Sequence, residues 1–149
     1  TDATNNKTSN NKIAGVWKLL SAYLNTGTER IPILGANPSG LLILTPGMNF
    51  SVTVNNPDTK HFKSGDRMNG TPQENQLATQ NSLALYGTYR TDELGEFLDQ
   101  HIQGLSFPNW NGLSRGREVL RLTAEGNRIT ENIDIPGAGL VEIIWNRVE

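Results

Sequence analysis

The chain contains no cysteine and only two histidines, His61 and His101, among its 149 residues. Disulfide bonds, thiolate metal sites and cysteine nucleophiles are therefore excluded. The two histidines do not stand at a metal-ligand spacing, so the sequence indicates no metal site. It also lacks a phosphate-binding loop, a nucleophile elbow and a zinc motif, and we therefore expect no cofactor.

Long apolar runs and a strong net charge are also missing. No run approaches the roughly 18 apolar residues that a membrane helix needs, so we expect no membrane insertion. The net charge is −2 and no basic cluster is present, which argues against a nucleic-acid partner. The composition is typical of a soluble globular protein. The oligomeric state and the compartment stay open, and of the possible compartments the cytoplasm is favoured.

The first twelve residues differ from the rest in having no apolar side chain larger than alanine. Such a segment cannot offset the entropy lost on ordering, so we expect residues 1–12 to form a disordered tail. The remaining length suits one domain with a buried core, over residues 13–149.

Alternating apolar residues predict strands along most of this domain. Residues 13–24 are apolar on both strand faces, and Pro46-Gly47 predicts a hairpin turn between residues 40–45 and 48–55. Turn signals separate five further predicted strands, at residues 85–91, 96–103, 116–123, 128–135 and 140–148. Eight closely spaced strands predict an all-β antiparallel barrel.

Two segments interrupt this pattern. Residues 25–39 form a long connection whose apolar centre, residues 31–34, would either fold over an opening as a flap or plug one end of the core. Thr71-Pro72-Gln73-Glu74 is a capping box with proline at the first helical position, and it predicts one helix over residues 72–84. Asn81 on that helix is either satisfied at the helix edge or directed into a pocket.

Residues 101–121 carry a histidine and three arginines among predicted strands, where polar groups are costly unless something binds them. His101 shares a predicted strand face with Phe97 and Asp99, so Asp99 would orient it as an acid/base pair. The alternative is a histidine with a structural role only.

Arg117 and Arg121 share a face, while Leu120 and Leu122 point the other way. Inward leucines would leave both arginines in solvent. Inward arginines would instead bind a carboxylate or enolate oxygen.

Aromatic and amide side chains supply further candidates. Tyr86 and Tyr89 lie on opposite faces of one strand, so only one can point inward, and Tyr86 is preferred as the hydroxyl donor. The Pro108-Asn109-Trp110 turn would cap the barrel mouth or form an aromatic wall for a ligand.

Glu131 falls on a strand face that it shares with Ile129, Ile133 and Ile135. A carboxylate among isoleucines has a raised pKa unless it is paired, which suits a general acid or base. That face would otherwise be the barrel exterior, or Glu131 would lie in water at the mouth. Arg147 is expected to close the barrel by stacking on an aromatic ring and bonding strand-end carbonyls.

The chain resembles the lipocalin-like domain family, small calycin-type proteins of bacteria and fungi. The resemblance rests on Gly15-Val16-Trp17 with the following LLSA, NPSGLLILTPGMNFSV, the GDR and GTP-x-E segments, YGTY, HIQGLSFPNWNG and IIWNRV. It implies an up-and-down barrel of about eight strands around a cup, closed at the bottom by Trp17 against Arg147. Family members often have two histidines where this chain has Gln100-His101. Related barrels bind apolar ligands or act as cyclases, isomerases or decarboxylases of small molecules.

Three functions are consistent with these observations. The first is binding of a small, mostly apolar molecule with one polar head. The second is a cofactor-independent cyclase or isomerase acting on a polyketide-like or other natural-product substrate. The third is a structural module with a filled interior. The candidate catalytic residues are His101, Glu131 and Tyr86, and the candidate ligand-binding residues are Arg117, Asn109, Trp110, Asn81 and Tyr89.

Overall fold

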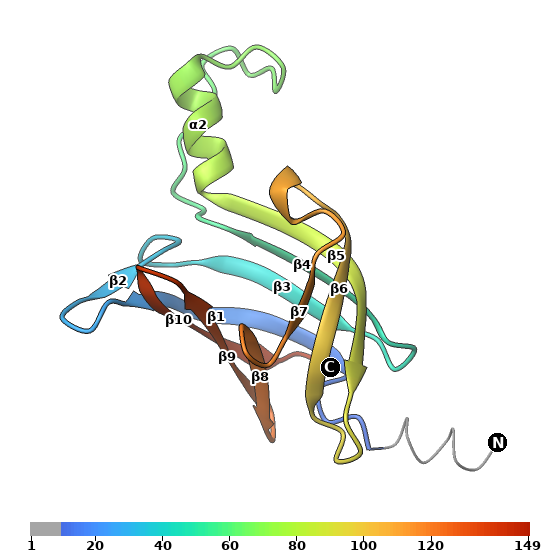
Figure 1. Ribbon diagram of the computed structural model, residues 1–149. Helices are drawn as coiled ribbons and strands as arrows, with labels where there is room; N and C mark the ends of the chain where they lie inside the picture. The colour runs from blue at the N-terminus through green and yellow to red at the C-terminus, as the bar shows by residue number, and fades with distance from the viewer. Residues whose placement is uncertain (1–9) are drawn as a thin grey trace.

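A single antiparallel sheet forms most of the computed structural model, which describes residues 10–149. Its strands are β1 (Gly15–Asn25), β2 (Arg30–Pro32), β3 (Ser39–Leu44), β4 (Asn49–Asn55), β5 (Ser82–Thr91), β6 (Phe97–Leu105), β7 (Ser114–Gly116), β8 (Leu120–Glu125), β9 (Arg128–Ile135) and β10 (Gly139–Arg147). The sheet follows the order β7-β6-β5-β4-β3-β1-β10-β9-β8 and curls into a nearly closed barrel (Figure 1). The predicted all-β antiparallel barrel is confirmed.

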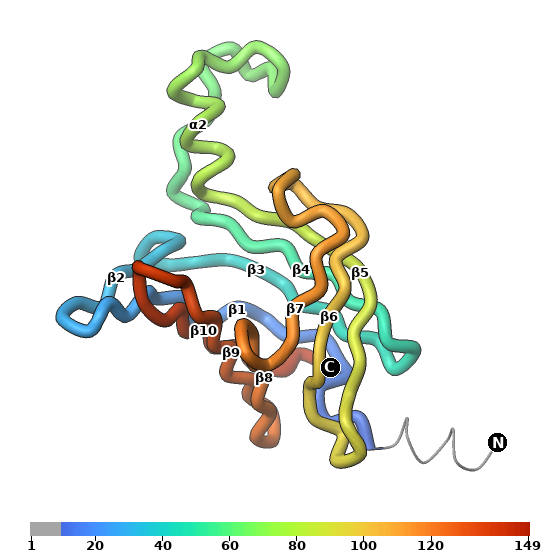
Figure 2. The backbone as a smooth tube through the Cα atoms, viewed as in Figure 1, coloured from blue at the N-terminus to red at the C-terminus, as the bar shows by residue number. Residues whose placement is uncertain are grey.

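The short strands β7 and β8 together occupy one strand position. β7 pairs with β6 and β8 pairs with β9, both antiparallel, and the alternating directions around the sheet make β7 and β8 run the same way. A turn in which Val119 N donates to Gly116 O separates them (Figure 2). The strand predicted over residues 116–123 is therefore broken in two. Counted by position, the barrel has the predicted up-and-down arrangement of about eight strands.

The connection between β1 and β3 extends the sheet locally rather than crossing the barrel. β2 pairs with the last residues of β1, and the Arg30 guanidinium lies 3.7 Å from the centre of the Tyr23 ring. Ile31 and Ile33 stay exposed, and Leu34 alone of the predicted apolar segment is buried. The segment thus contributes one side chain to the core.

Helix α2 (Pro72–Gln80) begins at the predicted capping box. Thr71 Oγ1 accepts a hydrogen bond from Glu74 N at 3.1 Å, and the Glu74 carboxylate accepts from Thr71 N at 2.9 Å. The helix ends four residues before the predicted limit because β5 starts at Ser82. None of its residues is buried, and it stands beyond the strand ends (Figure 1). No helix in residues 10–149 is long and apolar enough to cross a membrane.

Replacing Thr71 with alanine is expected to destabilise α2 by about 1 kcal/mol, because the helix loses its N-terminal cap. Since α2 buries no side chain, the loss should be local: its amides should exchange faster while the unfolding midpoint stays unchanged. Hydrogen exchange and thermal unfolding measure the two effects. Thr53→Ala, at an exposed strand position, is the matched control. A midpoint lowered by several degrees in Thr71→Ala alone would show that α2 unfolds with the barrel.

Trp17 and Arg147 close one end of the barrel. Trp17 is fully buried, and the Arg147 guanidinium lies 4.1 Å from the centre of its ring. Arg147 Nη1 also donates to Ala14 O at 2.8 Å, and Trp17 Nε1 donates to Ile13 O at 2.9 Å. Gly15 has a φ of 142°, and a Cβ atom there would lie 2.5 Å from Arg147 Nη1, so only glycine fits. The predicted closure by Trp17 and Arg147 is confirmed.

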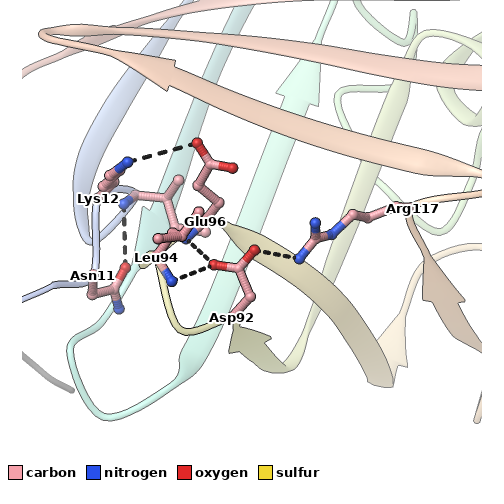
Figure 3. A network of polar contacts seen from close by, with 7 residues as sticks. Asn11, Lys12, Asp92, Leu94, Glu96 and Arg117 are labelled. Carbon is pink, nitrogen blue, oxygen red and sulfur yellow. Dashed lines mark hydrogen bonds and ion pairs between the residues drawn. The ribbon is translucent and has the colours of Figure 1, made fainter.

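The last residues of the predicted N-terminal tail are hydrogen-bonded to the barrel. Residues 1–9 of that tail lie outside the described residues. Asn11 Nδ2 donates to the Tyr89 hydroxyl at 2.8 Å, and Lys12 N donates to Gly95 O at 2.9 Å. Lys12 also pairs with Glu96 at 3.6 Å (Figure 3). Asn11 and Lys12 are therefore ordered against the barrel, because their polar groups bond to it.

Candidate ligand-binding site

The barrel encloses a cavity with a mostly apolar wall. A water-sized molecule can occupy about 80 Å3 of the cavity. All the space between the lining atoms, including solvent at the open side, amounts to about 650 Å3. One water molecule needs only about 10–15 Å3 of the space that a water-sized molecule can occupy. The cavity can therefore hold several waters or a compact ligand group. Its apolar lining includes Leu42, Phe50, Val52, Leu85, Ile133 and Ile143.

Arg115 and Gln100 form a buried polar pair in this wall. They face each other across the β6–β7 ladder, and both are less than a tenth exposed. Gln100 Oε1 accepts from Arg115 Nε at 2.9 Å and from Nη2 at 2.7 Å. The Arg115 guanidinium also lies 5.0 Å from the centre of the Trp110 ring. Strand pairing thus holds a positive charge at the wall of an apolar cavity.

Glu131 supplies the carboxyl group of the cavity. It comes from β9, and its Oε1 accepts from Trp145 Nε1 at 2.9 Å. Glu131 and Arg115 both line the cavity, yet the ion pairs found among the described residues do not include a contact between them. The charge of each group nevertheless acts on the pKa of the other.

Burial changes the proton affinities of both groups. Removal from water raises the pKa of Glu131, and the hydrogen bond from Trp145 and the charge of Arg115 only partly oppose it. Burial also lowers the pKa of the Arg115 guanidinium, against the effect of Glu131. Glu131 can therefore hold a proton at a pH where an exposed glutamate is ionised.

This shift predicts how stability depends on pH. A raised pKa means that the folded protein holds the Glu131 proton more tightly than the unfolded chain does. The stabilisation is complete below the ordinary value of 4.5 and is lost as the pH rises towards the folded-state pKa. Each unit by which folding raises the pKa is worth about 1.4 kcal/mol.

Glu131→Gln removes the titrating group, so the variant should not lose this stabilisation as the pH rises. We expect the unfolding free energy of the wild type, minus that of Glu131→Gln, to fall between pH 4 and pH 8 in urea denaturation experiments. The subtraction cancels the other carboxyl groups. A difference that rises with pH would mean that the folded protein stabilises ionised Glu131.

Three of the sequence-predicted residues meet at the cavity: Glu131, Trp110 and Tyr89. Of the two alternatives for the face that Glu131 shares with isoleucines, the structure shows the inner one, because Glu131 lines the cavity. Tyr89 is the inward tyrosine, with a hydroxyl that donates to Thr45 O at 2.6 Å. Burial raises the pKa of Tyr89. The preference for Tyr86 as the inward donor is wrong, because Tyr86 lies on the outer face and is 54% exposed.

A β-bulge in β6 reverses the predicted faces around His101. Arg90 pairs with Asp99 but Thr91 pairs with Phe97, which leaves Leu98 as an extra residue. Phe97 points inward before the bulge, and Gln100 points inward after it. His101 therefore lies on the outside.

His101 and Asp99 do not form the predicted acid/base pair. His101 is exposed, and its Nδ1 lies 2.9 Å from Ser114 Oγ. Asp99 instead forms an ion pair with Arg90 on the neighbouring strand. Neither side chain lines the cavity.

The two arginines predicted to share a face are outside as well. Leu120 and Leu122 are buried, so the leucines take the inner face. Arg117 pairs with Asp92 at 2.7 Å in the turn before β6 (Figure 3), and Arg121 pairs with an aspartate at 3.1 Å. The solvent-exposed alternative is therefore the one that the structure shows.

The two predicted asparagines do not line the cavity. Asn109 is exposed in the short 3-10 helix η1 (Pro108–Trp110). Asn81 caps the end of α2, where its backbone N–H donates to Leu77 O at 2.9 Å. Asn81 lines a separate outer hollow between α2 and the preceding loop.

Sequence reasoning missed Arg115 and Gln100, which form the polar part of the cavity. Strand β7 is only three residues long, too short for alternation to reveal which way Arg115 points. The available signal was Ile102, because Gln100 lies two residues before this fully buried side chain. The described residues contain no cluster of three or more histidine, aspartate or glutamate side chains that could hold a metal.

Comparison with known proteins adds a family to this geometry. A family model described as a lipocalin-like domain matches residues 14–147. A comparison with curated proteins finds no significant match. The matched range includes every strand that lines the cavity.

Proposed function

Because the chain belongs to the lipocalin-like domain family, we propose that it binds a small, mostly apolar molecule in the barrel cavity. The fold suggests ligand binding in general. The observation that carries the finer proposal is an apolar wall interrupted by one polar cluster of Arg115, Gln100 and Glu131. Apolar pockets with a few convergent polar groups are typical of small-molecule sites.

The polar groups of the cavity support binding over a purely structural role. The cavity volume limits that binding to a compact group, because about 80 Å3 is accessible to a water-sized molecule, compared with about 300 Å3 or more in typical ligand pockets. A buried arginine and a half-buried glutamate among apolar side chains cost free energy that apolar residues of similar size would not. A structural module would gain more from a filled interior. The barrel is closed at the other end by Trp17 and Arg147, so closure does not require the cluster.

The raised pKa of Glu131 supports a second candidate, a cofactor-independent enzyme. Glu131 would move a proton, and Arg115 would stabilise an oxyanion in a cyclisation or isomerisation of a natural-product substrate. His101 and Tyr86 lie outside the cavity and do not enter this proposal. Full turnover of an identified substrate by Glu131→Gln would exclude it.

Native mass spectrometry of protein purified gently from its own source tests the proposal, followed by solvent extraction of the bound molecule. We expect one apolar molecule per barrel. A molecule recovered unchanged supports binding, whereas a cyclised or isomerised product supports catalysis. A barrel that carries nothing, and also takes up nothing from its own source extract, would contradict both.

A further inference from the structure

Arg115 uses only part of its hydrogen-bonding capacity. Its guanidinium has five N–H donors, and Nε and Nη2 both donate to a single oxygen of Gln100. No described residue accepts from Nη1. Since no buried side-chain nitrogen in the described part of the chain lacks a partner, Nη1 is accessible from the cavity or from the outer hollow that Arg115 also lines. Gln100 is also neutral, so it fixes the guanidinium without cancelling its charge.

Glu131 likewise uses only one of its two carboxyl oxygens in a hydrogen bond. Its Oε1 accepts from Trp145, and no residue of the described chain donates to Oε2. By the same reasoning Oε2 borders open space, and Glu131 lines the cavity. The cationic group and the carboxyl group that line the cavity are therefore both incompletely bonded.

The other groups facing Glu131 cannot complete these bonds. Strands β8 and β10 bring Leu122, Ile143 and Trp145 to the cavity. The titratable groups that line it are Tyr89, Arg115 and Glu131. The Tyr89 hydroxyl already bonds to Thr45 and Asn11. Among the described residues, Arg115 is therefore the one charged group that lines the cavity together with Glu131.

We propose that the ligand carries a carboxylate, which accepts hydrogen bonds from Arg115 and from the protonated carboxyl group of Glu131. This proposal rests on the proposed binding function and names the chemical class of its ligand. One carboxylate oxygen takes the free donors of Arg115, and the other accepts from Glu131. The apolar remainder of the ligand contacts the aliphatic wall. The site then contains one positive and one negative charge, as a buried site requires.

A neutral or cationic head group satisfies this site less well. An alcohol leaves the charge of Arg115 uncompensated, and an amine is repelled by it. Hydrogen bonds between charged groups are about twice as strong as neutral ones. We therefore expect a carboxylate to bind about 10-fold to 100-fold more tightly than the alcohol of equal chain length.

The arrangement also fixes the direction of the pH dependence. Ionised Glu131 would repel the ligand carboxylate and would compete with it for Arg115. Carboxylate binding should therefore weaken as the pH rises through the range where Glu131 ionises. The raised pKa of Glu131 agrees with a protonated partner.

Calorimetric titration of the full chain with two series of probes tests the proposal. One series is butanoate, hexanoate, octanoate and decanoate, and the other contains the corresponding primary alcohols. The variants are Arg115→Met, Glu131→Gln and the control Arg117→Met, which removes an exposed arginine paired with Asp92 outside the cavity. Circular dichroism and thermal unfolding show whether each variant folds.

We expect the wild type and Arg117→Met to prefer carboxylates, and Arg115→Met to lose this preference while still binding alcohols. Glu131→Gln should keep the preference for carboxylates, and its affinity for them should no longer depend on the ionisation of residue 131. If alcohols bind the wild type as tightly as carboxylates, this proposal fails while the binding function stands. If neither series binds, the binding function fails as well. If Arg115→Met does not fold, the comparison of carboxylate and alcohol affinities in the wild type still tests the carboxylate proposal.

Discussion

Replacing Trp17 with alanine is expected to lower the free energy of unfolding by about 3–5 kcal/mol. Trp17 is fully buried at the closed end of the barrel, beneath the Arg147 guanidinium. The substitution leaves a cavity there. It also removes the ring on which Arg147 stacks and the donor that bonds Ile13 O. Urea denaturation measures the change.

Trp110→Ala is the matched control for this prediction. Trp110 is half-buried beside the cavity rather than enclosed at the barrel end, so its loss should cost clearly less. If Trp17→Ala cost no more than Trp110→Ala, the closed end would not be the main support of the barrel.

Replacing Val52 with phenylalanine is expected to weaken ligand binding about 10-fold to 100-fold. Val52 lies on β4 and lines the cavity, in which about 80 Å3 is accessible to a water-sized molecule. A phenyl ring directed into that space must be displaced or overpacked when the ligand enters, at a cost of about 1–3 kcal/mol. Calorimetric titration with octanoate measures the loss.

Ser51→Phe adds the same ring to the opposite face of the same strand. Ser51 is exposed, so this variant controls for the effect of a bulky residue on β4 itself. We expect it to bind octanoate like the wild type. Equal affinities for octanoate in Val52→Phe and the wild type would place the bound molecule outside the barrel cavity.

The sequence predicted those features of the fold that depend on local patterns. Alternating residues identified the strands, and the capping box at Thr71 identified the helix start. Glu131 was placed among isoleucines because β9 is regular from Arg128 to Ile135, so alternation stays in phase along it. The closure by Trp17 and Arg147 was predicted from the family resemblance and from the expectation that Arg147 stacks on an aromatic ring and bonds strand-end carbonyls.

The remaining features depend on pairing between strands. One extra residue at Leu98 reverses the faces of the residues that follow it, up to a second register shift at Gln103, and the alternation of a single strand does not show where a bulge lies. His101 was therefore assigned to the face of Phe97, whereas the structure has Gln100 on that face. Arg115 was missed because β7 is set by its pairing with β6 and not by its own pattern.

If one small carboxylate-bearing molecule enters the barrel cavity, the indole N–H signals of the three tryptophans should report its position. Trp110 and Trp145 line the cavity, and Trp145 bonds to Glu131, whereas Trp17 is buried at the closed end. In a nuclear magnetic resonance titration with octanoate, we expect saturable shifts of the Trp110 and Trp145 signals at one molecule per chain, with Trp17 unchanged. Saturating binding that leaves the Trp110 and Trp145 signals unmoved would show that the molecule binds outside the barrel cavity.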